Sequence, residues 1–351
     1  MKKIYRAAAL LLLVVFLTGL VIWQGKDRKN QRCSIQFLDV FDTVTEFTAY
    51  GESEKQFKKQ AELLHEKLQW YHKLYDIYHE YEGMNNLKTI NDQAGRAPVK
   101  VDEEVIQLLK FSKKMYKVTN QKTNIALGGV LKEWHISREE ALKHPELAAV
   151  PQKERLLEAS VHADLESVVI DEEESTVFLK EKGLLLDVGS IGKGYAVQRL
   201  AEYAETIGMQ HLLINVGGNI YAVGDKADNQ KWKVGIQNPD SKSEVPYLKT
   251  VQIEDQCVVT SGDYQRFFIV NGKRYCHIID PETLFPPEYC ASVSIIAKDS
   301  GEADALSTAL FTMPYKEGSA YVRQEQGVEA MWIFKDGTIK YSDGFEKYLV
   351  P

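Results

Sequence analysis

A glycine-rich segment with an acid before it and a lysine within it could bind a phosphate group. Asp187 follows a run of leucines and precedes the segment Gly189–Gly194, which contains Lys193. Free backbone N–H groups at the start of a helix attract anions, and glycines let a phosphate approach them closely. The order of residues is not that of a Walker loop, G-x-x-x-x-G-K-[ST]. An ordinary strand-to-helix turn would explain the same residues.

Two further segments combine glycine with polar side chains. Asn215-Val216-Gly217-Gly218-Asn219 follows an apolar run, and backbone exposed there could contact a nucleotide, although a hairpin turn is the simpler explanation. The second, Thr260-Ser261-Gly262-Asp263-Tyr264, lies between two predicted strands, where its hydroxyls and glycine suit ligand contact or a turn. Neither segment identifies a ligand by itself.

Asp304 and Thr308 are four residues apart, so on a helix their side chains share one face. A carboxylate beside a hydroxyl suits a hard cation such as Mg²⁺, but a helix-start acid and a threonine bonded to its own backbone give the same pattern.

His277 precedes Asp280 by three residues. A lone histidine is more often structural, yet near its ordinary pKa of roughly 6.5 it could accept a proton. Together the segments supply the parts needed for phosphoryl transfer.

These side chains must be positioned by strands and helices, and the hydrophobic spacing predicts both. Helical spacing predicts a long amphipathic helix over residues 54–80 and a second over 102–118, capped by Asp102. Further helices are expected over 191–207, ended by Gly208, and over 302–311. Residues 137–157 are charged and are expected to be helical or looped.

Short runs rich in Val, Ile and aromatic residues predict strands separated by Gly, Asn and Asp turns. The expected strands cover residues 167–170, 176–179, 184–186, 212–216, 232–236, 264–270, 275–279, 292–297 and 330–334, with two more within 35–50. This mixture predicts an α+β fold, a single mixed α/β domain with a helical N-terminal part.

The composition and charge limit the classes of function. The formal net charge of −7 argues against a nucleic-acid-binding protein, which needs a basic face. An apolar content of 44% is enough for a large buried core. The four cysteines lack the spacing of a metal site and are expected to be free thiols, although a disulfide is permitted outside the cytoplasm.

The N-terminus predicts a membrane anchor. Lys2, Lys3 and Arg6 precede an uninterrupted apolar stretch over residues 7–23, just long enough to span a bilayer. Basic residues on the N-terminal side predict that the rest of the chain lies outside the cytoplasm. We expect residues 1–33 to form a signal-anchor helix and linker and residues 34–351 to form the folded domain. A cleaved signal peptide is the alternative.

The chemistry-bearing segments resemble the signature of the ApbE family, the FAD:protein FMN transferases. The family pattern is approximately D-[LV]-G-[GS]-I-[AG]-K-G-[YF], N-x-G-G-N, T-S-G-x-Y, H-I-[IL]-D-P-x-T-G-x-P and D-A-L-[AS]-T. Its parts occur in this order around Asp187, Asn215, Thr260, His277 and Asp304. The similarity extends from about residue 35 to the C-terminus and implies a flavin transferase (ApbE) type of α+β domain.

The resemblance also implies roles for individual residues. Asp304 and Thr308 match side-chain ligands of Mg²⁺, and Ser190 matches a further metal-binding position. Ser307, beside Thr308, is expected to belong to the metal site as well. His277 matches the residue proposed as general base. Positions that match FAD contacts are Phe41, Tyr81, Asn124, Asp187, Lys193 and Ile278. The segments containing Gly217, Gly218, Asn219, Ser261 and Tyr264 are expected to border the cofactor as well.

The implied reaction places the pyrophosphate of FAD between the metal and the Asp187–Gly194 turn. A Thr or Ser hydroxyl of an extracytoplasmic acceptor protein attacks the phosphorus on the FMN side, and AMP leaves. A second interpretation is a Mg²⁺-dependent FAD pyrophosphatase, in which water replaces the hydroxyl. A third is a non-enzymatic flavin-binding protein.

The chain departs from the family pattern at several positions. Leu284 replaces the glycine of D-P-x-T-G-x-P, Phe41 replaces Met, and Asn124 replaces Asp. Asn85-Asn86 stands where the family usually has Ser-Glu. A glycine at position 284 would permit a positive φ, which leucine does not adopt easily. These differences concern the rate and the fit of the flavin.

Overall fold

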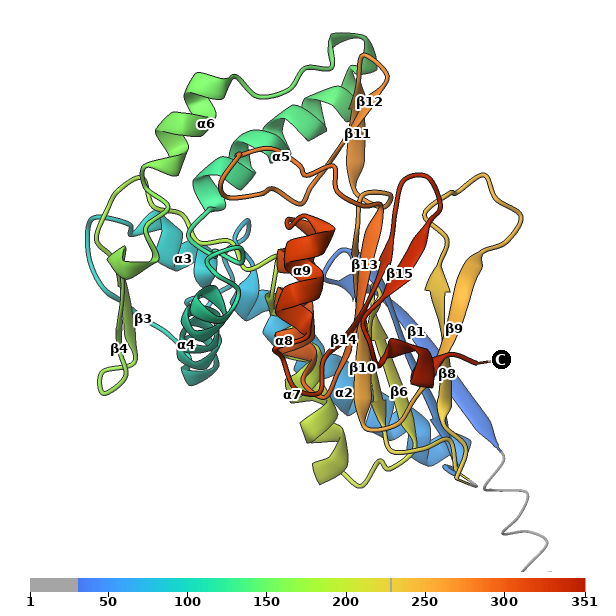
Figure 1. Ribbon diagram of the computed structural model, residues 1–351. Coiled ribbons are helices and arrows are strands. Elements are labelled where there is room, and N and C mark those ends of the chain that lie inside the picture. Colours follow the sequence, from blue (N-terminus) through green and yellow to red (C-terminus); the bar gives the residue numbers. More distant parts are fainter. Residues whose placement is uncertain (1–30, 228, 351) are drawn as a thin grey trace, which may run out of the picture.

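An antiparallel sheet of eight strands, in the order β1-β2-β6-β7-β10-β13-β14-β15, forms the centre of the computed structural model (Figure 1). The structure describes residues 31–227 and 229–350. The strands are β1 (Arg32–Val40), β2 (Thr43–Tyr50), β6 (Leu212–Val216), β7 (Asn219–Val223), β10 (Gln256–Gly262), β13 (Ser292–Ala297), β14 (Glu329–Ile333) and β15 (Ile339–Tyr341). Every neighbouring pair is antiparallel.

Helices and three small sheets surround this centre. The α-helices are α2 (Glu54–Tyr75), α3 (Leu87–Asp92), α4 (Glu103–Val118), α5 (Gly128–Lys143), α6 (Lys153–Ser160), α7 (Gly192–Thr206), α8 (Ser300–Phe311) and α9 (Tyr315–Val322). Short 3₁₀ turns cover Pro145–Leu147, Leu165–Ser167 and Phe345–Tyr348. The small sheets pair β3 (Val99–Lys100) and β4 (Val168–Asp171) with β5 (Thr176–Leu179), β8 (Trp232–Gln237) with β9 (Tyr247–Ile253), and β11 (Phe267–Val270) with β12 (Lys273–Cys276).

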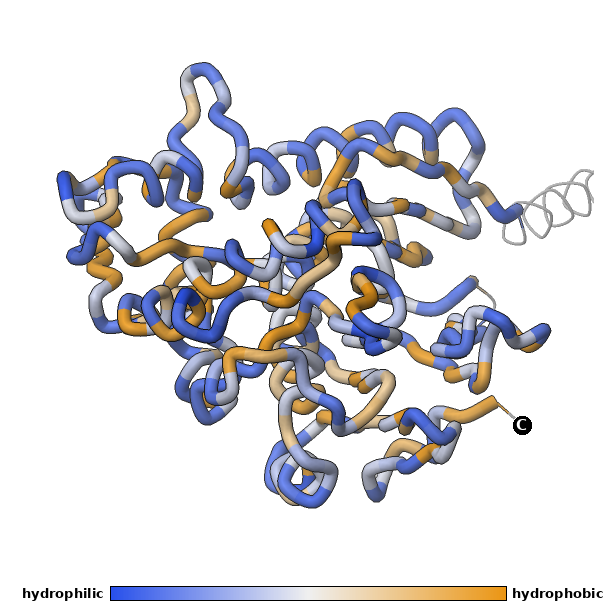
Figure 2. Tube along the Cα trace, turned by 90° about the horizontal axis from the view of Figure 1, so that it is seen from above, coloured by the Kyte–Doolittle hydropathy of each residue, from blue (hydrophilic) through white to orange (hydrophobic). Residues whose placement is uncertain are grey.

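Both faces of the large sheet are covered. Helices α2, α7 and α8 pack on one face (Figure 1). Leu64 and Leu68 of α2 are fully buried there in the main core. The β8–β9 hairpin packs on the other face around Trp232 and Val258. Burial of one such side chain contributes about 1.5–3 kcal/mol. Figure 2 shows the apolar segments running through the interior and the hydrophilic segments along the outer turns.

Several predicted elements are confirmed. Helix α4 begins at Glu103, and the Asp102 side chain accepts a hydrogen bond from the Glu104 N–H, as expected of an N-cap. Helix α7 ends at Thr206, and Gly208 follows with a φ of 83°, the left-handed conformation in which glycine commonly terminates a helix. The strand over 176–179 has the predicted bounds.

The helix predicted over residues 54–80 was wrong at its C-terminal end, because α2 stops at Tyr75. The Asp76 carboxylate accepts hydrogen bonds from the backbone N–H groups of Tyr78 (2.6 Å) and His79 (3.2 Å). A short acid that bonds the backbone two residues ahead favours a turn over a helix. The apolar spacing continued to Tyr78, but this local competition ended the helix earlier.

The predicted strands were wrong at three places next to the glycine-rich segments. Residues 184–186 form no strand and make only a single bridge, between Leu185 and Leu127. The Thr260–Gly262 segment, expected between strands, is the end of β10. Strand β12 ends at Cys276, and His277 therefore lies in a loop. Strands β3, β7, β9, β10 and β15 were not predicted.

The predicted anchor over residues 7–23 lies outside the described residues. Within residues 31–227 and 229–350, no helix combines the length and apolar character needed to cross a membrane. Strand β1 begins at Arg32, and the boundary proposed at residue 34 stays a prediction. The four cysteines are free and buried, as expected.

Candidate active site

A cavity of about 570 Å³ collects segments that are far apart in the sequence. The residues predicted as site residues that line it are Phe41, Asn124, Asp187, Ser190, Lys193, Gly217, Ser261, His277, Ile278, Asp304 and Thr308. Tyr81, Gly218, Asn219, Tyr264 and Ser307 do not line it. Each of the sequence motifs therefore contributes residues to one cavity, as it must if these residues act together in one reaction.

The turn before α7 lines the cavity, and most of its backbone N–H groups already donate to acceptors within the protein. The Gly189 N–H donates to the Asp187 carboxylate (2.7 Å), which fixes the turn. Burial raises the pKa of Asp187 although this hydrogen bond lowers it. At Gly194 a Cβ atom would come within 2.2 Å of the Ser300 carbonyl oxygen. Only glycine therefore lets the first turn of α7 pack this closely against α8, whose start lies beside it.

Lys193 supplies the cation of this turn. Its ammonium group lines the cavity and donates to the Asn219 Oδ1 atom (3.3 Å) at the start of β7. The β6–β7 hairpin turn has Gly217 and Gly218 with φ values of 56° and 90°, and the simpler interpretation as a hairpin is correct. A Cβ at Gly217 would also lie 2.3 Å from the Thr43 hydroxyl oxygen. Asn219 itself does not line the cavity, but it accepts the hydrogen bond that holds the Lys193 side chain there.

Asp304 lies on the face of α8 that borders the cavity. It is 4% exposed, and its carboxylate accepts the Gly194 N–H (2.7 Å). Burial raises the pKa of Asp304, while the positive charge of Lys193 opposes this shift. No ion pair reaches Asp304 within the described residues. A buried carboxylate without a paired cation is costly, so a bound cation beside it would compensate its charge.

The hydroxyl groups around Asp304 divide into two sets. Thr308 lines the cavity, and its Oγ1 atom lies 3.4 Å from the Ser261 Oγ. Ser307 is fully buried, lies 2.8 Å from the Ser261 Oγ and donates to the Asp304 carbonyl oxygen. Ser307 thus supports Ser261 from behind, whereas Thr308 faces the cavity.

This donor set fits Mg²⁺ held together with a substrate phosphate. Among the residues that the structure describes, no group of three or more His, Cys, Asp or Glu side chains could hold a metal. Mg²⁺ keeps several waters and is commonly bound through one or two carboxylates plus substrate phosphates. Asp304, Thr308 and the turn containing Ser190 offer hard oxygen donors of that kind, and Lys193 lines the same cavity.

His277 follows β12 and lines the cavity. The backbone N–H of His277 donates to the Arg266 carbonyl oxygen (3.0 Å), and the ring Nδ1 atom of His277 lies 3.3 Å from the same oxygen. A carbonyl only accepts, so the neutral ring carries its proton on Nδ1 and leaves Nε2 as the acceptor. The ring surface is open to the cavity, but crowding by the protein, with Arg266 and Lys193 nearby, lowers the pKa of His277 to about 4. The expected value of roughly 6.5 was therefore wrong.

Lys122 was missed in the sequence. It is 7% exposed, lines the cavity and forms ion pairs with Asp280 (3.1 Å) and Glu282 (3.0 Å). Burial opposes its charge, but hydrogen bonds to Glu282 and Asp280 outweigh this and raise the pKa of Lys122. The pair fixes the segment that follows His277. A lysine in a polar loop normally indicates a solvated surface, so no sequence signal pointed to this role.

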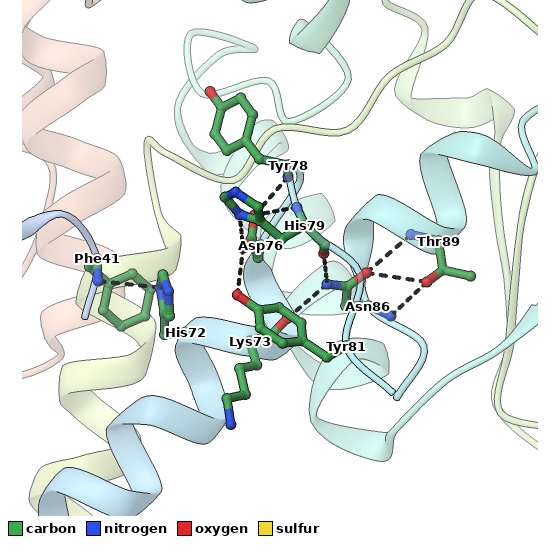
Figure 3. A network of polar contacts seen from close by, with 9 residues as sticks. All are labelled: Phe41, His72, Lys73, Asp76, Tyr78, His79, Tyr81, Asn86 and Thr89. Carbon is green, nitrogen blue, oxygen red and sulfur yellow. Dashed lines mark hydrogen bonds and ion pairs between the residues drawn. The ribbon is translucent and has the colours of Figure 1, made fainter. Parts of the chain in front are cut away.

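The flavin-contact positions Phe41 and Asn124 lie on the cavity wall with their polar atoms in use. Phe41 has a φ of 52° in the β1–β2 turn, and its N–H donates to His72 Nδ1 (3.3 Å) (Figure 3). The Phe41 carbonyl accepts from the Arg266 guanidinium (3.4 Å). The Asn124 side chain donates to the Ala163 carbonyl (2.9 Å). Both residues are held by the fold before any ligand binds.

Tyr81 lies outside the cavity, and Tyr78 lines it instead. The Tyr81 hydroxyl donates to the Asp76 carboxylate (2.7 Å), which also holds the backbone of Tyr78 and His79 (Figure 3). Asn86 caps α3 and donates to the His79 carbonyl (2.9 Å). The Asn85-Asn86 departure therefore has a structural role in this turn.

Leu284 adopts the left-handed conformation that its position in the family pattern suggested, with a φ of 62°. Its N–H donates to the Asp280 carbonyl (2.8 Å), and its carbonyl accepts the Trp134 indole N–H (2.9 Å). The side chain is 7% exposed and packs in a third small core with Trp134 and Phe268. Packing thus offsets a backbone strain of about 1–2 kcal/mol.

We expect the Leu284→Gly variant to be more stable than Leu284→Ala by about 1 kcal/mol. Both variants lose the packing of the leucine, but only glycine also relieves the backbone strain. At an ordinary position glycine is less stable than alanine by about 0.5–1 kcal/mol, so the order is reversed. Urea unfolding of the two variants measures the difference, and a more stable alanine variant would contradict the strain.

Comparison with known proteins places the chain in one family. A sequence model of the ApbE family matches residues 41–332. A FAD:protein FMN transferase of Treponema pallidum is 37% identical over 272 residues, covering 74% of this chain and 73% of the relative. A FAD:protein FMN transferase of Escherichia coli K12 is 27% identical over 348 residues, covering 96% of this chain and 95% of the relative.

Solved structures agree with this placement. The ApbE protein of Thermotoga maritima superposes with a TM-score of 0.80 at 27% identity, covering 92% of this chain and all of the other. The flavin transferase ApbE of Vibrio cholerae, at 22% identity and a TM-score of 0.75, covers 91% of this chain and supports the fold alone. The site motifs, the matched range and the shared architecture together show that this chain belongs to the ApbE family.

Proposed function

We propose that the protein is a FAD:protein FMN transferase that attaches FMN to a Thr or Ser hydroxyl of another protein. The observation that carries the proposal is that Asp304, Lys193 and His277 line one cavity. A buried acid for a metal, a cation for phosphate and a neutral base are the groups that phosphoryl transfer requires. The curated relatives from Treponema pallidum and Escherichia coli carry the same named activity.

The chain's own residues account for binding and proton transfer. The Lys193 ammonium binds the pyrophosphate together with the backbone N–H groups of Ser190 and Lys193, which have no acceptor among the described residues. The acceptor oxygen forms a bond to the FMN-side phosphorus, while the bond from that phosphorus to the bridging oxygen breaks and AMP leaves with this oxygen. The hydroxyl proton passes to Nε2 of His277. When bound at Asp304 and Thr308, with help from the turn at Ser190, Mg²⁺ supplies neutralisation of the phosphate oxygens.

Incubation of the full chain with FAD, Mg²⁺ and a candidate acceptor protein tests the proposal. Covalent flavin on the acceptor with release of AMP is the expected result. Free FMN and AMP without covalent flavin would indicate the alternative, a FAD pyrophosphatase. Intact FAD would indicate a flavin-binding protein without catalysis and would contradict the proposal.

Tyr78 is proposed as the aromatic contact of the flavin in place of Tyr81. We expect Tyr78→Ala to weaken FAD binding about tenfold or more, because a ring contact contributes about 1 kcal/mol beyond its buried area. Tyr81→Phe should leave FAD affinity within about twofold and lower stability by about 1 kcal/mol through the lost bond to Asp76. FAD titration and thermal melting of both variants decide, and equal losses of affinity would contradict the assignment.

The location of the domain is proposed from the N-terminal residues. The basic residues before the apolar stretch over 7–23 favour an anchor with the catalytic domain outside the cytoplasm. The acceptor is then an extracytoplasmic flavoprotein. Protease protection of the catalytic domain in intact cells would contradict this topology, whereas cleavage by external protease is expected.

A further inference from the structure

A second cavity of about 650 Å³ adjoins the catalytic one. The two cavities share the lining residues Thr43, Gly217, Thr260 and Gln265. Thr260 immediately precedes Ser261, which contacts Thr308 at the proposed metal end. The second cavity therefore meets the first at the phosphate end, and it offers a separate route to the reacting atoms.

The walls of this cavity form a groove, here called the β8 groove. Its floor is one face of the large sheet, because alternate residues of β2 line it, namely Glu46, Thr48 and Tyr50. One wall is β8, from which the consecutive residues Trp232, Lys233, Val234 and Gly235 all line the cavity. Consecutive residues point to opposite faces of a strand, so β8 presents its backbone edge to the groove.

That edge of β8 has no strand beside it within the described residues. Strand β8 pairs only with β9, and the far edge of β9 is covered by the C-terminal segment, through Leu349 and the Val350 N–H bond to Thr250 (2.9 Å). An open edge exposes N–H and C=O groups that can pair with an extended peptide. The groove combines this edge with a direct connection to the catalytic cavity.

The charges of the groove favour an acidic ligand. Arg32 and Glu46 lie 3.7 Å apart and largely cancel. Lys226 and Lys233 also line the groove, and neither is in an ion pair among residues 31–227 and 229–350. The buried indole N–H of Trp232 has no hydrogen-bond partner among the same residues. In a chain of net charge −7, this end of the groove is locally basic and rich in donors.

We propose that an extended segment of the acceptor protein adds as a strand to the open edge of β8, and that its hydroxyl reaches the catalytic cavity past Gly217 and Thr260. The inference rests on the proposed transferase function. The carboxyl end of β8 is the catalytic end, because Gln237 bonds Gln265 (3.4 Å), which lines both cavities. The basic end lies at Trp232, whose ring is 5.5 Å from that of Tyr50.

The length of β8 sets the position of the acidic residues in the acceptor. Lys233 precedes Gln237 by four residues, which corresponds to about 14 Å along a strand. Acidic side chains about four to five residues from the modified Thr or Ser would reach the lysines. A basic segment in the same place would be repelled.

Synthetic peptides of about twelve residues test the groove. Each has a single Thr in an Ala and Gly background, with an Asp pair or a Lys pair about four and five residues before or after it. The full chain, the Lys226→Glu/Lys233→Glu double variant and the matched control Lys249→Glu are incubated with FAD and Mg²⁺. Covalent FMN on the peptide and release of AMP without peptide are measured separately.

For the wild type and Lys249→Glu, we expect an Asp peptide to accept FMN about tenfold faster than its Lys counterpart. The double variant should lose or reverse this preference while releasing AMP in the absence of peptide at an unchanged rate. Amide exchange over residues 232–237 should slow when the preferred peptide binds. Equal rates for Asp and Lys peptides would overturn the groove assignment alone. AMP release with no peptide modified would indicate a FAD pyrophosphatase and overturn the proposed function. Uncleaved FAD would overturn the proposed function and the groove assignment with it.

Discussion

Replacing Asp304 with asparagine is expected to lower FMN transfer by roughly 1000-fold, equivalent to about 4 kcal/mol of transition-state stabilisation. Asparagine keeps an oxygen that can accept the Gly194 N–H, so the packing of α7 against α8 is retained. The negative charge that would hold a divalent cation is lost. Activity of the wild type should likewise disappear when a chelator removes divalent metal and return when Mg²⁺ is added.

The stability of this variant separates a metal role from a structural one. A buried carboxylate without an ion pair destabilises the native state in the absence of metal, so Asp304→Asn should melt at the same temperature as the wild type or higher. Glu302→Gln is the matched control, because Glu302 lies on the same helix and forms its one ion pair among the described residues with Lys114 at the surface. Full transfer by Asp304→Asn in the presence of chelator would refute the metal assignment.

Replacing His277 with asparagine should slow FMN transfer by about 100- to 10,000-fold, the usual contribution of a general base. FAD affinity should change by only a few-fold, because the base acts on the hydroxyl in the transition state. Single-turnover transfer and FAD titration on the same variant measure the two effects. His144→Asn, which changes an exposed histidine, is the control.

The low pKa of His277 predicts an unusual pH dependence. Because the pKa is about 4, the imidazole stays neutral and able to accept a proton well below pH 6. The acid limb of kcat/KM is therefore expected near pH 4 in the wild type and should be absent in His277→Asn. An acid limb near pH 6.5 that persists in the variant would contradict His277 as the base.

The same shift affects stability with a defined sign. The folded-state pKa of His277 lies below that of the unfolded chain, about 6.5. The unfolded state therefore binds a proton first as the pH falls, and the stability contributed by this group is lost between about pH 6.5 and pH 4. The wild type should lose more thermal stability over this range than His277→Asn does.

Much of the site could be predicted from the sequence because its parts are short and local. Three parts of the site, the Asp187–Gly194 turn, Asp304 and His277, each lie in a short segment with a recognisable pattern of residues. At position 194, for example, only glycine fits against α8. The prediction that these segments meet in one site came from their resemblance to the ApbE family and not from their spacing. Spacing alone did not predict the order of the large sheet, since its strands pair across more than one intervening helix.

The missed features depend on contacts between distant residues. Lys122 is buried only because Asp280, far along the chain, neutralises it, and neither neighbour in sequence indicates this. Tyr81 matches a flavin-contact position of the family pattern, but Tyr78, which is held by the turn at Asp76, lines the cavity. A residue selected by the family pattern lies at the cavity only if the chain around it also follows the family's path, and the sequence alone does not show that path.

The burial of the Lys122–Asp280 pair has a consequence for the behaviour of the protein in salt. Surface pairs such as Lys110–Glu172, with half-exposed side chains, weaken as dissolved ions screen them over about 8–10 Å at physiological ionic strength. Dissolved ions do not enter the space between Lys122 and Asp280, whose side chains are 7% and 3% exposed. The segment that carries His277 should therefore keep its position at high salt concentration, where exposed ion pairs on the surface of the protein are screened.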